Sequence, residues 1–435
     1  MTRTKVPTAS SRTTARRVIA ASFIGTTVEW YDFFLYGTAS ALVFNRLFFP
    51  EFSDVAGTIA AFGAFAAGFL ARPLGGAVFG HFGDRIGRKS MLVYSLVGMG
   101  VATVAIGLLP TYDQVGVLAP ILLVLCRLIQ GFAVGGEWGG AMLMSVEHSD
   151  SKRRGFAGSW VQAGSPAGLV LATVVFSLFA ALPDEQFLAW GWRVPFLLSA
   201  VLLIVGLAIR LQVLESPEFQ AVKDSGKRST KPLVEALRRH PVNTLLAIGA
   251  CLAPFVNFYL FATFVLTYAT TALGLDESTV LPIVAVAALV EVATIPLAAA
   301  LSDRIGRRTV FLAGAVLLAA YAYPFFLINE ANPSGLVLGV TSVVGLAVIH
   351  PLMYGPLAAL FAEMFDPEVR YSGASIGYQI GAILGGGFAP MILVSLQSLD
   401  AGAAVTIPPY IIALCALTAI SVWVATKPGR REVRS

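Results

Sequence analysis

Five ionisable residues lie inside long apolar stretches of this sequence: Glu29, Asp32, Arg127, Glu137 and Glu291. An ionised side chain at the centre of a lipid-facing helix costs about 2.5–3.5 kcal/mol. If all five side chains faced lipid, their combined cost would be roughly 12–17 kcal/mol. These residues must therefore face a cavity or one another, and acids placed in this way can bind and release protons.

The acids of the first apolar stretch have helical spacing. Glu29, Asp32 and Tyr36 stand at positions i, i+3 and i+7, which predicts that they share one helix face. Two ionised carboxylates at this spacing repel each other, so protonation of one of them is favoured. We predict that Glu29 or Asp32 couples proton movement to function, with Asp32 favoured because it lies deeper. The alternative is a buried pair in which one acid only neutralises Arg127.

Arg127 allows two interpretations. Its guanidinium matches a carboxylate with two parallel hydrogen bonds, which suits an acidic substrate. It could equally form an ion pair with Glu29, Asp32 or Glu137. Glu137, seven residues after Gln130 and on the same stripe, is a third candidate for proton coupling.

Other polar residues in apolar runs are candidates to line a substrate site. With Arg127 the set comprises Tyr36, Gln130, Trp138, Gln162, Asn257, Tyr259, Glu291, His350 and Tyr354. His350 and Tyr354 are helical neighbours, and a hydrogen bond within the core explains His350 as well as substrate contact does. We expect Tyr378 and Gln379 to lie too near the cytoplasm to reach a site at mid-membrane.

The composition indicates what must position these residues. Of the 435 residues, 57% are hydrophobic and 13% charged, whereas a soluble protein carries about 25% charged residues. A spanning helix needs about 20 apolar residues. Runs of that length begin near residues 18, 56, 91, 118, 156, 193, 242, 278, 309, 335, 372 and 404. We predict an all-α membrane protein with twelve spanning helices.

The charges predict the topology. Residues 214–241 form a polar linker between two six-helix bundles, 1–213 and 242–435. With the N-terminus inside, 26 of the 30 Lys and Arg residues fall on the cytoplasmic side; Arg46 and Arg193 lie outside, and Arg72 and Arg127 lie within spans. The positive-inside rule thus places both termini in the cytoplasm and explains the basic composition without nucleic acid. The three cysteines lie in apolar runs and the four histidines do not cluster, so we expect no disulfide framework, metal or other cofactor.

The two halves repeat a charged motif. Residues 83–89 read G-D-R-I-G-R-K and residues 302–308 read S-D-R-I-G-R-R. Glu147 and Arg154 recur as Glu363 and Arg370 at nearly the same offset. This pattern predicts a duplicated unit whose charged residues close the cytoplasmic side. The predicted gating residues are Asp84, Arg85, Arg88, Lys89, Glu147, Arg154, Asp303, Arg304, Arg307, Arg308, Glu363 and Arg370.

The repeated motif, with R-L-I-Q-G at 127–131, resembles the signature of the major facilitator superfamily. Narrower strings resemble its metabolite:proton symporter branch and, nearly end to end, shikimate permeases. They are V-E-W-Y-D-F-F-L-Y-G (28–37), Q-G-F-A-V-G-G-E-W-G-G-A (130–141), G-W-R-V-P-F (191–196) and R-Y-S-G-A-S-I-G-Y-Q (370–379). The resemblance implies two pseudo-symmetric six-helix bundles, proton coupling and an organic solute.

The expected function is import of a small polar metabolite with protons, by alternating access. The solute class is an organic acid such as shikimate or a related carboxylate; the alternative is a proline- or betaine-type compatible solute. We expect a monomer in the cell (inner) membrane whose partners are solute, protons and lipid. An enzyme is disfavoured because no nucleophile–base set and no metal-ligand spacing occurs in the sequence.

Overall fold

The computed structural model describes residues 9–86, 88–135, 137–147, 149, 153–212, 238, 240–365, 370–399 and 402–427. At some of these positions, including residues 80–86, 88 and 89, only the backbone is described. The predicted linker 214–241 lies outside the described residues, apart from 238, 240 and 241.

The described chain is built from helices that are long enough to cross a bilayer. Within it, nine helices pass a test of length and apolar character, and the bent pair Asp184–Gly191 with Arg193–Ile209 makes a tenth. The long helices α1 (Ala9–Leu42) and α4 (Arg88–Leu108) bring the number to the predicted twelve. An apolar chain adopts this form because a helix satisfies every backbone hydrogen bond internally, where lipid offers none.

Each half of the chain contributes six spans. Those of the first half are α1, α3 (Asp54–Ile86), α4, α6 (Leu118–Val134) with α7 (Glu137–Glu147), α8 (Arg154–Ala180) and α10 (Arg193–Gln212). Those of the second half are α13 (Pro241–Tyr259) with α14 (Val265–Thr271), α15 (Glu277–Ile305), α16 (Arg307–Ala331), α17 (Gly335–Ser342) with α18 (His350–Met364), α19 (Arg370–Ala382) with α20 (Ala389–Gln397), and α21 (Ala403–Ala425). The paired helices of the second half are joined by π-helical turns at Leu260–Phe264, Val343–Ile349 and Ile383–Gly387.

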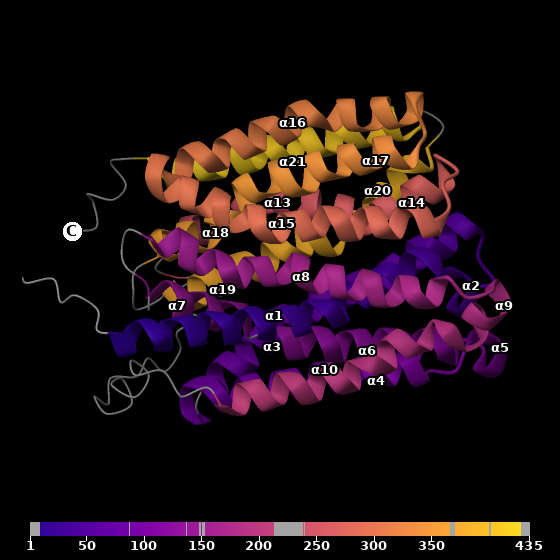
Figure 1. Cartoon of the computed structure of the whole chain (residues 1–435), viewed down its shortest axis with the longest axis horizontal. Coiled ribbons are helices and arrows are strands. Elements are labelled where there is room, and N and C mark those ends of the chain that lie inside the picture. The colour runs from indigo at the N-terminus through magenta and orange to yellow at the C-terminus, as the bar shows by residue number, and fades with distance from the viewer. Residues whose placement is uncertain are drawn as a thin grey trace, which may run out of the picture.

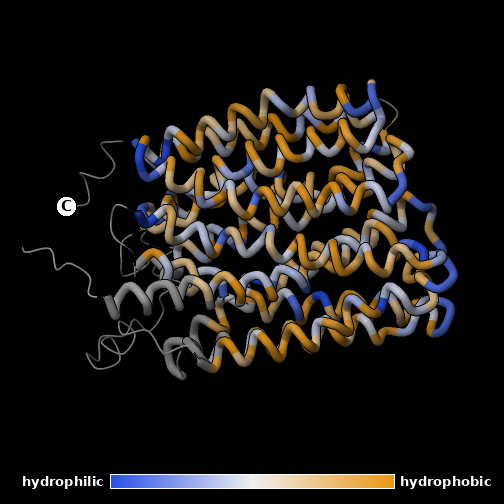
Figure 2. The backbone as a smooth tube through the Cα atoms, in the orientation of Figure 1, coloured by the Kyte–Doolittle hydropathy of each residue, from blue (hydrophilic) through white to orange (hydrophobic). Residues whose placement is uncertain are grey.

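The helices run side by side between two faces of the molecule. The start of α1 lies at one face, here called the termini face, on the left of Figure 1. The short connecting helices α2 (Phe44–Phe48), α5 (Tyr112–Val115) and α9 (Asp184–Gln186) lie at the opposite face. Figure 2 shows apolar residues along the helices and hydrophilic residues gathered toward the faces. Large apolar side chains such as Leu74, Ile204 and Leu297 are exposed on the flanks, as a lipid-facing surface requires.

Several helices of the first half pack against helices of the second half. In the fold, α8 packs along α15, α3 packs against α19 and α20, and α1 packs against α14. Aromatic side chains fill much of the contact, as between Phe34 of α1 and Phe258 of α13, whose ring centroids are 5.3 Å apart. Three of the polar residues singled out in the sequence, Glu29, Glu137 and Trp138, lie where the two halves meet.

Candidate functional site

A small cavity lies between the two halves. Its volume is about 10 Å³, room for about one water molecule. Helices of both halves line it, through Thr26, Glu29, Trp30, Arg72, Val134, Glu137, Trp138, Ala141, Val161, Tyr378 and Gln379. A solute can therefore occupy this position only when the halves move apart.

Arg72 of α3 is the cationic side chain among the lining residues. It is 2% exposed, and its guanidinium carbon lies 4.2 Å from the ring centroid of Phe69 and 4.4 Å from that of Phe33. Glu29, Tyr259 and Tyr378 are its electrostatic neighbours. From the sequence, Arg72 was predicted to lie in a span, without a functional role. An arginine in an apolar span is as costly at position 72 as at position 127, so the sequence signal that made Arg127 a candidate also applies to Arg72.

The acids of α1 point in different directions. Glu29 lines the cavity, whereas Asp32 lies near the hydroxyls of Thr103 on α4 and Ser199 on α10, inside the first half. The prediction of one shared face is therefore only partly right. Three residues turn a helix by about 300°, so neighbouring side chains on one stripe still diverge by about 60°.

Arg127 lies in a separate cluster inside the first half, not in the lining of the cavity. Its guanidinium donates to Oε1 of Gln130 at 2.8 Å and to the carbonyl oxygen of Phe65 at 3.3 Å. The carbon of that guanidinium lies 4.1 Å from the ring centroid of Tyr36. Gln130 in turn donates to Thr103 at 2.6 Å. Arg127 and the residues around Asp32 thus belong to one polar network. Tyr36 and Gln130 contact Arg127 in this network and do not line the cavity.

The first two residues of α7 were both predicted as site residues, and both line the cavity. Glu137 accepts from the hydroxyl of Ser95, at 3.5 Å. The indole nitrogen of Trp138 donates to Oε1 of Gln162 at 2.8 Å. The ring of Trp138 also stacks on that of Tyr378, with centroids 3.7 Å apart and planes 11° from parallel. Trp138 belongs to the first half and Tyr378 to the second, so this stack joins them across the cavity.

Tyr378 and Gln379, which the sequence predicted to lie near the cytoplasm, both line the cavity. Since α19 begins at Arg370, Tyr378 stands eight residues inside the helix, about 12 Å along its axis. Gln379 also donates to the carbonyl oxygen of Gly135 in the first half, at 3.1 Å.

The predicted residues of the second half form a buried cluster next to the cavity. Glu291 of α15 is bonded to Nδ1 of His350 on α18, and both side chains are at most 1% exposed. The ring of Tyr354 stacks on His350, and its hydroxyl lies 3.3 Å from that of Tyr378. This cluster therefore touches the lining at Tyr378.

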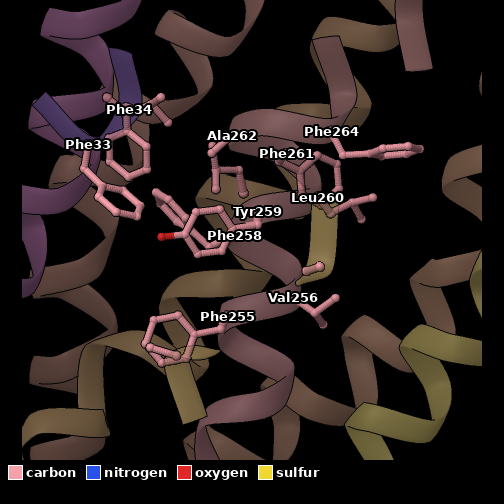
Figure 3. Packing of buried hydrophobic residues seen from close by; sticks show 14 of the residues in the cluster. Phe33, Phe34, Phe255, Val256, Phe258, Tyr259, Leu260, Phe261, Ala262 and Phe264 are labelled. Atoms are coloured by element: carbon pink, nitrogen blue, oxygen red, sulfur yellow. The ribbon is translucent and has the colours of Figure 1, made fainter. Parts of the chain in front are cut away.

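Asn257 and Tyr259 of α13 have different surroundings. The Asn257 amide donates to the carbonyl oxygen of Gly345 at 3.1 Å, which ties α13 to the neighbouring span. Tyr259 packs against Phe65 and Phe69 of the first half, and its buried hydroxyl has no hydrogen-bond partner among the described atoms. Figure 3 shows Phe33 and Phe34 of α1 facing Phe258 and Tyr259.

The charged motif of the second half joins the two halves at the termini face. Asp303, near the end of α15, accepts from the backbone N–H groups of Gly155 at 3.1 Å and Phe156 at 3.0 Å, in the first turn of α8. Arg307 bonds Asp303 at 2.9 Å and Glu363 at 2.6 Å. Anionic groups at a helix N-terminus are stabilised by its dipole, so this contact favours closure of that face.

The other predicted gating residues divide into two groups. Arg308 lies over the ring of Trp423, while Arg154 and Arg304 are exposed at the same face. The remaining six side chains lie outside the described part of the structure: Asp84, Arg85, Arg88, Lys89, Glu147 and Arg370.

Comparison with protein-family models shows the family to which the chain belongs. The model of the Major Facilitator Superfamily matches residues 22–390 and 246–435. The chain belongs to this superfamily. It is thus a membrane transporter and not an enzyme, and the predicted fold class is confirmed.

Curated relatives within the superfamily are similar over most of their length. The shikimate transporter of Escherichia coli strain K12 is 44% identical over 410 residues, covering 94% of this chain and 93% of that protein. The inner membrane metabolite transport protein YhjE of the same strain is 41% identical, covering 93% and 92%. The proline/betaine transporter of Salmonella typhimurium strain LT2 is 36% identical, covering 85% and 76%.

Solved structures share the fold. The crystal structure of D-xylose-proton symporter superposes with a TM-score of 0.73 at 18% identity, over 94% of this chain and 97% of that one. At this identity the likeness establishes the arrangement of the two six-helix halves and nothing about the solute.

Proposed function

We propose that this transporter imports a small organic acid, such as shikimate or a related carboxylate, together with protons. The observation that carries the proposal is that Glu29, Glu137 and Arg72 line one cavity shared by both halves. A proton on either acid removes one negative charge from the lining, so the cavity then accepts an anion more readily. Proton and anion binding therefore favour each other, as linkage requires.

Glu29 is our first choice for the proton-binding acid. It lines the cavity, where solute and water arrive when the halves separate, while Asp32 lies in the network within the first half. Asp32 stays a candidate because Thr103 links its surroundings to Gln130 and Arg127.

The test is uptake into proteoliposomes with and without an imposed proton gradient. The panel holds shikimate, a dicarboxylate and betaine. We expect uphill uptake of shikimate only with the gradient. Glu29→Gln should abolish uphill uptake while leaving exchange of solute between the two sides. The exposed Glu185 of the opposite face offers a matched control, since Glu185→Gln should behave as the wild type. Gradient-dependent uptake that persists in both Glu29→Gln and Asp32→Asn would refute the proposed coupling.

A compatible solute is the second candidate. The similarity to a proline/betaine transporter favours it, and a zwitterion carried with one proton would move net charge. Such transport would draw about 2.3 kcal/mol from each 100 mV of membrane potential, whereas a monoanion with one proton would draw none. Uptake with the voltage clamped separates the two, because only the zwitterion's uptake would respond to voltage.

We also propose that Asp303, Arg307 and Glu363 act as a gate at the termini face, and that this face is cytoplasmic, with the chain a monomer. The gate follows from the hydrogen bonds of Asp303 to α8 across the two halves. The orientation follows from the excess of Lys and Arg in the corresponding loops and tails.

A further inference from the structure

We propose that Arg72 binds the carboxylate of the solute directly and that Arg127 is a structural residue. The inference rests on the proposed function and names the recognising group within that site. It assigns a hydroxylated monocarboxylate as the chemical class that the cavity fits.

The two buried arginines differ in what their guanidinium groups face. Arg127 donates to Gln130 and to the Phe65 carbonyl within its own half, and Gly68 of α3 packs directly on it: a Cβ there would lie 3.1 Å from its Nη2. Arg72 lines the cavity and Arg127 does not, although the Nε of each has no hydrogen-bond partner among the described atoms. A carboxylate entering between the halves therefore reaches Arg72 first.

The aromatic rings around Arg72 leave its N–H groups available to a carboxylate. Its guanidinium is held by the rings of Trp30, Phe33 and Phe69, at 5.6, 4.4 and 4.2 Å from the ring centroids. Aromatic faces attract a cation without using its N–H donors, so these donors stay available for a planar acceptor. A guanidinium held in this way binds a carboxylate with little loss of side-chain freedom.

Polar atoms near Arg72 match the rest of the solute. Oε1 of Gln379 and the hydroxyl of Tyr259 are buried without hydrogen-bond partners among the described atoms. Leaving such groups unpaired destabilises the closed cavity, and hydroxyl groups of a bound solute would satisfy them. The stack of Trp138 on Tyr378 borders the same space and offers flat apolar faces to a carbon ring once the halves separate. A small hydroxylated acid presents all three features.

The test compares acids with their methyl esters, which keep the shape and lose the charge. Binding of shikimate, quinate and 4-hydroxybenzoate, and of the methyl ester of each, is measured calorimetrically on the purified full-length transporter. We expect the wild type to bind at least one acid more tightly than its ester. Because a hydrogen bond to a charged group is worth more than a neutral one, Arg72→Gln should weaken acid binding by about 10- to 100-fold and leave ester binding nearly unchanged. Arg72→Lys keeps the charge but loses the two parallel N–H donors of the guanidinium. Its affinity for the acid should lie between those of the wild type and Arg72→Gln.

Two controls keep structural loss apart from lost recognition. Arg127→Lys should lower the melting temperature yet retain the preference for acid over ester. Arg193→Lys changes an arginine at the opposite face, which donates to the carbonyls of Gly107 and Leu109, and should bind as the wild type. Variants are compared only as monodisperse protein, and Arg72→Lys serves if Arg72→Gln does not fold.

The outcomes separate this inference from the proposed function. A preference for acid that survives in Arg72→Gln or is lost in Arg127→Lys overturns the inference, even if the wild type concentrates the acid in proteoliposomes. A wild type that binds no acid more tightly than its ester overturns it as well. Arg72-dependent preference without uphill uptake would support the inference and refute the transport proposal.

Discussion

The buried charges of this transporter are divided among three groups of residues. Arg72 and Glu29 line the cavity between the halves, Arg127 belongs to a network inside the first half, and Glu291 with His350 forms a pair inside the second. Each group avoids the cost of an isolated charge in a different way: by ring faces and a shared cavity, by neutral acceptors, or by a hydrogen bond between an acid and an imidazole. Charges that look equivalent along the chain therefore have separate tasks.

The Glu291–His350 pair is expected to be essential to the stability of the second half. Removing one partner from a buried pair leaves the other unpaired, at a cost of about 3–5 kcal/mol. We predict that Glu291→Ala and His350→Ala each lower the melting temperature in detergent, and that the double variant loses less than the sum of the two. A matched change of the exposed Glu185 to Ala should have no effect. Strictly additive losses would show that the two side chains do not depend on each other.

At the scale of helices, close approach decides which residues face the cavity. Gly131 of α6 touches Gly68 of α3 so closely that a Cβ on Gly131 would overlap the carbonyl oxygen of Gly68. Gly135 likewise meets the carbonyl oxygen of Arg72. These contacts hold α3 against α6 in one rotation about its axis, with the Arg72 side chain toward the second half.

Gly131→Ala is therefore predicted to disturb both stability and binding. The added methyl group meets backbone, which cannot move aside as a flexible side chain can, and overpacking of this kind costs about 1–3 kcal/mol. We expect a lower melting temperature and weaker binding of the solute, measured on the same preparation. Gly63 of α3 is the matched control, since a Cβ there would have its nearest neighbour, Sδ of Met391, at 3.9 Å. Equal behaviour of Gly131→Ala and Gly63→Ala would contradict this account of helix rotation.

The contact of Asp303 with the start of α8 leads to a prediction about the gate. Asp303→Asn removes the charge that faces the helix dipole and Arg307, an interaction worth about 1 kcal/mol. We expect a shift of about fivefold toward conformations open at the termini face. Spin labels at Arg153 and Ile305, in a variant without the three native cysteines, would report it as longer distances.

The exposed Asp113 of the opposite face provides the matched control for that experiment. Asp113→Asn makes the same chemical change away from the contact between α8 and α15. Its distance distribution should equal that of the parent. A distribution that is also unchanged in Asp303→Asn would remove Asp303 from the gate.

At the scale of the whole molecule, the sequence was sufficient for the fold and for part of the cavity lining. Twelve spans follow from length and apolar character because lipid imposes the same condition on each of them. Glu29, Glu137 and Trp138 were predicted as site residues, and they line the cavity. Arg72 and Tyr378 were missed because the direction in which each points depends on contacts between helices distant in the chain. Neither composition nor spacing distinguishes Arg72 from Arg127.

The halves touch on both sides of the cavity, and alternating access requires each contact to open in turn. Toward the opposite face, a Cβ on Gly37 of α1 would lie 3.4 Å from the side chain of Thr263. Toward the termini face, a Cβ on Gly158 of α8 would lie 3.3 Å from the Cβ of Ala358 on α18. At 158 and 358 the two Cβ positions are about as close as in a disulfide, whose Cβ atoms lie about 3.5–4.5 Å apart. At 37 and 263 the Cβ position meets Oγ1 and Cγ2 of the threonine, so this pair is the longer of the two.

We predict that either cross-link alone stops transport. Cysteine pairs at 37 and 263, or at 158 and 358, are introduced into the variant without native cysteines and oxidised in proteoliposomes. Each oxidised pair should abolish uptake and regain it on reduction, because a half-cycle open to one side cannot move solute across. Each cysteine introduced alone should transport before and after oxidation, which controls for strain at the glycines. Uptake that continues while either pair is fully cross-linked would mean that the contact on that side of the cavity does not have to open.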